Sequence, residues 1–169
     1  MTDASPDALA LHKDALVVDN LVYHADGWPD NLRAGQIDAI AVTACHFECD
    51  FEQACQEVAR WQERFMAPDS QWMQIETVAD FDKARAAGKL GAILGWQNTR
   101  PVADRIERLA LFYKLGLRVM QLTYNYRNMI GDGCLEPEGA GLTTYGREVV
   151  AEMNRLGITS VIDAGGGGQ

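Results

Sequence analysis

Short apolar runs, most of them followed by a pattern typical of a helix, constrain the fold of this chain more than any other feature. Five runs are expected to form strands: 15–21, 37–44, 90–96, 118–124 and 158–163. They are apolar nearly throughout, as expected for strands of a parallel sheet that is buried on both faces under helices. The order of these segments predicts an α/β fold, either a (β/α)8 barrel or a doubly wound sheet.

Helices are expected between the runs. Apolar residues recur every three or four positions from 51 to 65, after a plausible N-cap at Asp50. Thr77 and Asp80 resemble a capping box, and Gly88 ends that helix. Two more helices are expected at about 101–115 and at 143–157. The loop 125–142 is longer than a simple connector, which leaves open a flexible substrate-facing lid or a plain surface loop.

The bulk properties restrict the function classes. The 169 residues suffice for a single domain, 1–169, with a Gly-rich tail at 164–169. A net charge of −9 argues against a nucleic-acid partner. The N-terminus does not resemble a secretory signal, and no apolar stretch reaches the ~20 residues of a membrane span. We therefore expect no membrane association, reduced cysteines and a cytoplasmic location.

Polar residues follow the strands at the ends where parallel α/β folds place their chemistry. They are Asp19, Asn20, Cys45, His46, Glu48, Cys49, Gln97, Asn98, Tyr124, Asn125 and Asp163. This pattern predicts a ligand site at that end of the sheet. The alternative is the ordinary polarity of loops.

Familiar catalytic and metal motifs are weak or missing. The segment CHFEC, 45–49, holds two thiols, an imidazole and a carboxylate, but no second ligand pair follows at zinc-finger spacing. His12 is expected at the surface and His24 in a loop. With three histidines, the chain alone cannot build a conventional two-metal hydrolytic site. It also contains no GxGxxG fingerprint, P-loop or GxSxG motif.

Two segments, LGLRVMQLTYN (115–125) and GLTTYGREVVAEMNRLGI (141–158), closely resemble the membrane (renal) dipeptidase family. VVDNLVYH (17–24) and AILGWQN (92–98) are similar to its first and third strands. The resemblance covers nearly the whole chain and ends about midway through the family's barrel. The chain therefore looks like the N-terminal half, and the alternative is a complete open sheet with a flexible tail.

The resemblance implies a partial (β/α)8 TIM-type barrel, roughly its first five strands, and a hydrolase with two zinc ions that cleaves dipeptides. Carried over by residue, the metal-ligand positions of the first strand fall at Leu21 and Tyr23, and the metal-bridging glutamate falls at Gln97. The substrate-contacting histidine falls at Tyr124. The chain thus resembles a divergent branch with degenerate ligand positions at Leu21, Tyr23 and Gln97, which we do not expect to bind zinc alone.

Two functions follow as expectations. The first is a metal-dependent, dipeptidase- or amidohydrolase-like protein that hydrolyses a dipeptide or related small amide. Gln97, Asn98, Tyr124 and Asn125 would line its substrate pocket, and this chain would be incomplete for catalysis. The second is a non-catalytic barrel that has lost its metal and binds a small ligand. A half barrel that is inert, unstable or a homo-oligomer is a further possibility for the chain itself.

Overall fold

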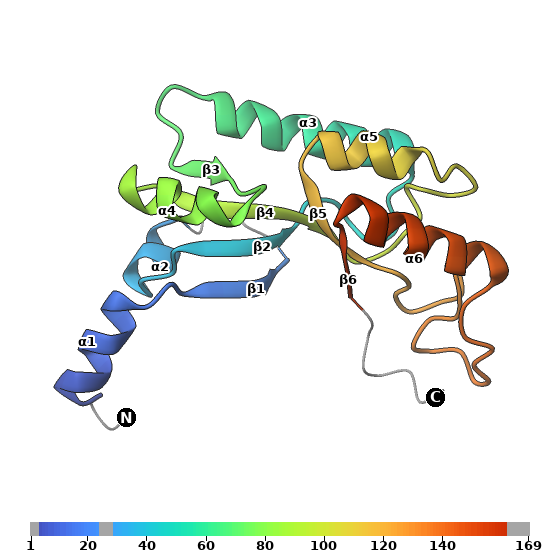
Figure 1. Ribbon diagram of the computed structural model, residues 1–169, viewed down its shortest axis with the longest axis horizontal. Helices are drawn as coiled ribbons and strands as arrows, with labels where there is room; N and C mark the ends of the chain where they lie inside the picture. The colour runs from blue at the N-terminus through green and yellow to red at the C-terminus, as the bar shows by residue number, and fades with distance from the viewer. Residues whose placement is uncertain (1–3, 24–28, 162–169) are drawn as a thin grey trace.

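The computed structural model describes residues 4–23 and 29–161, and Figure 1 shows α3, α5 and α6 along one side of the strands. The strands are β1 (Val18–Val22), β2 (Ala39–Thr43), β3 (Trp72–Gln74), β4 (Leu90–Trp96), β5 (Leu117–Gln121) and β6 (Thr159–Val161). The helices are α1 (Pro6–Asp14), α2 (Pro29–Ala34), α3 (Phe51–Met66), α4 (Val78–Ala86), α5 (Arg108–Lys114) and α6 (Thr144–Leu156).

The strands form one parallel sheet in the order β1-β2-β4-β5-β6. The remaining strand, β3, pairs with residues 90–92 of β4, whereas β5 pairs with residues 94–96. Since β2 runs along the other edge of β4, β3 and β5 share one edge. The prediction of a parallel α/β fold is confirmed.

The core lies between the sheet and the helices. Leu94 of β4, Met120 of β5 and Val149 of α6 are fully buried. The ring of Trp96 meets Phe112 of α5 edge-on, with ring centroids 4.4 Å apart. Burying this apolar surface supplies the main stabilisation of the fold. The opposite face of the central strands is not part of this core.

The predicted helix caps are present. The Asp50 carboxylate accepts from the backbone N–H of Gln53, whose side chain accepts from the N–H of Asp50. The Asp80 carboxylate accepts from Thr77 and from the Lys83 ammonium, and these hydrogen bonds hold the pKa of Asp80 well below its usual range. These local contacts explain why α3 and α4 begin where the sequence indicates.

The helix expected at 101–115 is shorter than predicted, because α5 begins only at Arg108. Successive i to i+3 hydrogen bonds lead from Thr99 through Val102 to Arg105. The backbone of Ala103 has a φ of 50°, in the left-handed region that interrupts a right-handed helix. The helical spacing of apolar residues continues through this segment, although its backbone does not form an α-helix.

The prediction that every strand is buried on both faces is wrong for the two strands at the ends of the sheet order, β1 and β6. Val18 is 37% exposed and Leu21 is 59% exposed, whereas β2 and β4 are almost completely buried. The reason is position, since β1 ends the sheet order and only β2 pairs with it. Among the described residues, the main helix contacts of the sheet involve β3 to β6.

Three short elements, α1, α2 and β3, were not predicted. The first, α1, buries none of its residues, and β3 has only three residues, so neither has a strong apolar pattern. His12 is exposed as expected. His24, Asp163 and the tail 164–169 lie outside the described residues. No helix in the described part of the chain is long and apolar enough to cross a membrane.

Candidate functional site

A small cavity of about 100 Å³ opens on the sheet face opposite the core, toward the carboxyl ends of the strands. Thr43 of β2 and Gln97, which directly follows β4, contribute its polar side chains together with Asn20 and Gln121. Its apolar lining includes Leu21, Ala41, Val119 and Val161. We call it the sheet cavity. The sequence predicts a site at this end of the sheet, and the cavity lies there.

Three residues that line this cavity each have a buried side-chain polar atom without a hydrogen-bond partner. Within the described residues, the buried side-chain atoms without a partner are Thr43 Oγ1, Gln97 Oε1, Trp96 Nε1 and Tyr145 Oη. The first three belong to residues of the sheet cavity. Thr43 is 8% exposed and Gln97 is 9% exposed, so water has little access to either. Buried polar groups normally have partners, which makes this cluster a candidate for ligand binding.

Small side chains leave the space that forms the sheet cavity. Gly95 lies between Thr43 and Gln97 in the sheet, because Gly95 is the register partner of Thr43 and precedes Gln97 by two residues. A Cβ at Gly95 would lie 3.2 Å from both the Cβ and the carbonyl oxygen of Val119. Ala41 adds another short side chain to the floor. Glycine at this position therefore lets β5 approach closely and keeps the cavity open.

Asn98, a predicted substrate residue, uses its side-chain oxygen for hydrogen bonds within the protein. Its Oδ1 accepts from the N–H of Thr99 and from Nδ2 of Asn128, both at 2.8 Å. The same Nδ2 donates to Thr99 Oγ1 at 3.0 Å and to the carbonyl oxygen of Leu122 at 2.9 Å. Asn128 thus ties the end of β4 to the end of β5 and fixes the backbone beside Gln97.

Tyr124 lies in a row of aromatic rings beyond the strand ends. Its ring centroid is 4.4 Å from that of Phe47, and Phe47 is 4.1 Å from His46. His46 in turn meets the ring of Tyr23 edge-on at 6.3 Å. Burial, and next the neighbouring Tyr124, raises the pKa of Tyr23. These rings connect the ends of β1, β2 and β5, but they do not line the sheet cavity.

Asn125 begins the loop 125–142, which is folded onto the strand ends. The N–H of Leu135 donates to the carbonyl oxygen of Asn125, and the N–H of Cys134 donates to that of Tyr124. A Cβ at Gly133 would lie 2.5 Å from backbone atoms of 124–126. Asp132 accepts from the N–H of Ala140, and this hydrogen bond lowers the pKa of its carboxyl group. These contacts favour a fixed surface loop over a flexible lid.

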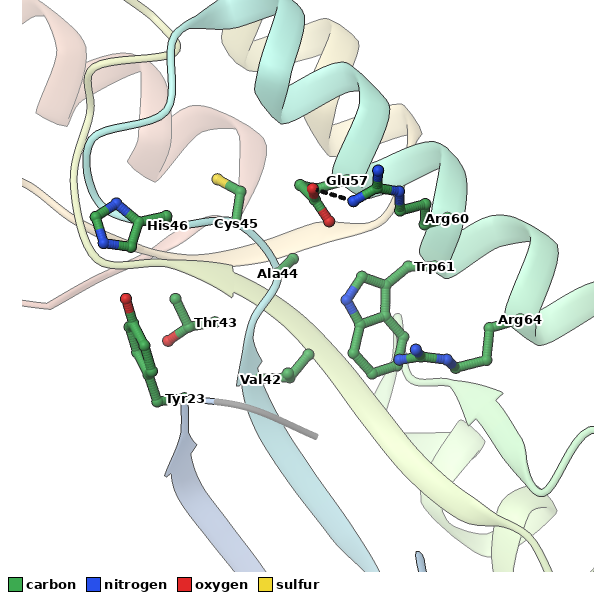
Figure 2. A pocket seen from close by; sticks show the side chains of 10 residues that line it. All are labelled: Tyr23, Val42, Thr43, Ala44, Cys45, His46, Glu57, Arg60, Trp61 and Arg64. Atoms are coloured by element: carbon green, nitrogen blue, oxygen red, sulfur yellow. Dashed lines mark hydrogen bonds and ion pairs between the residues drawn. The ribbon is translucent and has the colours of Figure 1, made fainter. Parts of the chain in front are cut away.

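A larger cavity of about 300 Å³ lies between α3 and the ends of β1 and β2 (Figure 2). Thr43 and Val42 point to opposite sides of β2 there. Arg60 forms an ion pair with Glu57 at 2.5 Å, and the guanidinium of Arg64 stacks 4.3 Å over Trp61. Because these charges already have partners, we favour the sheet cavity despite its smaller size.

The four predicted substrate residues therefore do not share one pocket. Gln97 lines the sheet cavity, whereas Asn98 and Asn125 line a separate recess of about 50 Å³ and Tyr124 belongs to the aromatic row. Sequence reasoning missed Thr43 and Gln121. A hydroxyl within the apolar run 37–44 was the available signal for Thr43.

Comparisons with known proteins agree with this architecture. The family model of membrane dipeptidases (peptidase family M19) matches residues 18–164. The chain belongs to the membrane dipeptidase family. Among solved structures, an amidohydrolase from Pseudomonas aeruginosa is 30% identical with a TM-score of 0.82, and the match covers 90% of this chain and 47% of that one.

Other relatives of the family are more distant. Dipeptidase aclJ of Aspergillus oryzae is 33% identical over 73 residues, which are 42% of this chain and 17% of that protein. Dipeptidase 3 of Rattus norvegicus is 27% identical over 95 residues, which are 53% and 20%. The probable dipeptidase PvdM from Pseudomonas aeruginosa shares the fold, with 18% identity, a TM-score of 0.76 and coverage of 93% and 48%. The chain spans about half the length of these solved relatives, and its parallel sheet is a half-barrel.

The zinc that membrane dipeptidases use does not fit the described residues of the sheet cavity. Leu21 and Gln97 line it, and Tyr23 lines the larger cavity, so none of the three supplies an imidazole, thiolate or carboxylate. Between residues 4–23 and 29–161, no three His, Cys, Asp or Glu side chains gather closely enough to hold a metal. In the CHFEC segment, burial raises the pKa of the Cys45 thiol. We derive no chemical step through zinc.

Proposed function

We propose that the protein is a dipeptidase- or amidohydrolase-like protein that acts on a dipeptide or a related small amide. The observation that carries this proposal is the sheet cavity, with its unpartnered Thr43 and Gln97 oxygens, at the carboxyl ends of a half-barrel of the membrane dipeptidase family. Relatives that carry the name dipeptidase or amidohydrolase support the same class of substrate.

The residues on this chain are proposed to bind and orient the substrate. Gln97 and Thr43 would hold polar atoms of the amide, and Leu21 with Val119 would contact its apolar part. Asn98 would act indirectly, because its hydrogen bond with Asn128 holds the end of β4 in place. Tyr124 and Asn125 would shape the rim. The groups that activate water, and any zinc with its ligands, would come from outside the described residues.

Hydrolysis and metal content test this function together. The product of the complete reading frame that contains these 169 residues is incubated with a panel of dipeptides, with added zinc or with a chelator. We expect zinc-stimulated cleavage and bound metal by elemental analysis. Absence of both would refute the proposal. The 169-residue chain alone is expected not to turn over.

A non-catalytic binding protein is the second candidate. It is favoured by one observation: the described lining of the sheet cavity has no ionisable side chain that could act as a general acid or base. Thermal stabilisation by a small amide without turnover would support it. Metal-dependent turnover would exclude it. The cytoplasmic location and a homo-oligomeric state remain predictions.

A further inference from the structure

The two unpartnered oxygens of the sheet cavity define what a ligand must offer. Gln97 Oε1 is an acceptor, so its partner must carry an N–H or O–H group. Thr43 Oγ1 can donate one hydrogen bond and accept others. Buried groups without partners destabilise the empty cavity, so a ligand that satisfies both atoms is favoured over one that satisfies neither.

The spacing of these two residues suits one planar group. Thr43 pairs with Gly95 across the sheet, and Gln97 follows Gly95 by two residues, directly after the end of β4. Strand spacing and rise place the two Cα atoms about 8 Å apart. The side chains reach toward the cavity from both positions, and its volume of about 100 Å³ is well below the roughly 300–1,000 Å³ of sites that enclose a whole drug-sized ligand. The cavity therefore fits one functional group of a ligand.

The charge of that group follows from the lining. The described residues of the cavity are Asn20, Leu21, Ala41, Val42, Thr43, Gly95, Trp96, Gln97, Val119, Gln121 and Val161. None of them is ionisable. An ammonium or carboxylate that entered here would lose water without gaining a counter-charge, which is costly. A neutral amide offers both an N–H donor and a carbonyl acceptor without a charge.

We propose that the sheet cavity is a subsite for one uncharged amide group, in which Gln97 Oε1 accepts from the amide N–H and Thr43 Oγ1 donates to the amide oxygen. The small aliphatic side chains of Leu21, Ala41, Val119 and Val161 surround the carbon atoms next to that amide. The subsite selects ligands whose bound end is blocked as an amide over ligands whose bound end is a free amine or acid. This inference rests on the proposed function, since it specifies the substrate class of the same site.

Three matched probes test the charge selection on the 169-residue chain by isothermal titration calorimetry. They are N-methylacetamide (neutral), acetate (an anion) and methylammonium (a cation), so that each offers the cavity a single functional group. We expect the neutral probe to bind at least tenfold more tightly than either charged probe. Equal affinities, or tighter binding of a charged probe, would overturn the proposal.

Isosteric variants test the two named atoms. Thr43→Val removes the hydroxyl and is expected to weaken binding of the neutral probe five- to tenfold. Gln97→Glu places a carboxylate in the cavity and is expected to shift the preference to the cationic probe. Gln56→Glu on the exposed side of α3 is the matched control and should change neither preference. Circular dichroism checks folding, and unchanged selectivity in folded Gln97→Glu would contradict the assignment.

The outcomes separate this inference from the proposed function. Selective binding of the neutral probe, with no cleavage of any amide by the complete protein, would refute hydrolysis and keep the amide subsite. Cleavage of dipeptides, with no preference for the neutral probe, would keep hydrolysis and refute the subsite.

Discussion

The side chain of Asn128 uses both ends of its amide. Its Nδ2 donates to three oxygens at the ends of β4 and β5, and its Oδ1 accepts from the N–H groups of Ile130 and Gly131 at 2.7 and 3.2 Å. No sequence pattern pointed to this residue, because its partners come from three separate segments. Gln97 was found from the end of an apolar run, whereas Thr43 was not, since only the folded sheet brings the two together.

Exchanging Asn128 for Asp tests this network. The variant keeps the acceptor but replaces the donor with an oxygen that faces Asn98 Oδ1 and the carbonyl of Leu122. We expect a loss of about 2–3 kcal/mol in the free energy of unfolding, measured by urea denaturation. Asn31→Asp on the exposed surface of α2 is the control and should change it by less than about 0.5 kcal/mol. Equal stability of both variants would show that the network contributes little.

The helices of this chain begin at positions set by local capping hydrogen bonds and by contacts with neighbouring segments. The caps at Asp50 and Thr77 could be predicted because all their partners lie within four residues. The late start of α5 could not be, since the left-handed backbone of Ala103 that precedes it leaves no mark in the apolar spacing. Helix α6 begins against the loop 125–142, where a Cβ at Gly146 would lie 2.0 Å from the carbonyl oxygen of Ile130.

Gly146→Ala is therefore expected to destabilise the protein although alanine favours helices. The added methyl group meets backbone, which cannot move aside cheaply, so we expect a loss above about 2 kcal/mol in urea unfolding. Gly35→Ala is the comparison, because its new Cβ would find neighbours only at 3.5–3.6 Å. A stabilising effect of Gly146→Ala would mean that α6 and the loop pack less closely than described.

Asp80→Asn tests the cap of α4 through pH. The pKa of Asp80 is lowered in the folded protein, so its carboxylate stabilises the fold above the unfolded pKa of about 4 and this stabilisation is lost as the pH falls below it. We expect the variant to be less stable by about 1 kcal/mol at pH 7 and the difference to shrink below about pH 4. Thermal unfolding from pH 3 to 7 measures it, with exposed Asp82→Asn as the control. A pH-independent difference would argue against the carboxylate as the cause.

The molecule as a whole is a parallel half-barrel whose two ends differ from its middle. Its class and the positions of its five main strands along the chain could be predicted, because continuous apolar runs separated by helical patterns are typical of α/β folds. The exposure of β1 could not be, since Val18 and Leu21 are as apolar as residues of a buried strand. Burial depends on which strand stands at the end of the sheet, and the sequence of a single strand does not contain that information.

Hydrogen exchange tests this difference across the sheet. Amides of β2 and β4 pair on both edges, whereas β1 and β6 stand at the ends of the strand order. We expect amides of β2 and β4 to exchange at least about 100-fold more slowly than those of β1 and β6 in the 169-residue chain. Equal protection of β1 and β4 would indicate that something covers the outer edge in solution, such as a second copy.

The central claim is that the unpartnered oxygens of Thr43 and Gln97 form a ligand site on the open face of this half-barrel. The most direct measurement is a nuclear magnetic resonance titration of the isotope-labelled chain with N-methylacetamide. We predict saturable shifts at the Gln97 side-chain amide and at the backbone of Thr43, Gly95 and Gln121, with little change along α3. Shifts that centre on the α3 side of β2, or no saturable shift at Gln97, would contradict the claim.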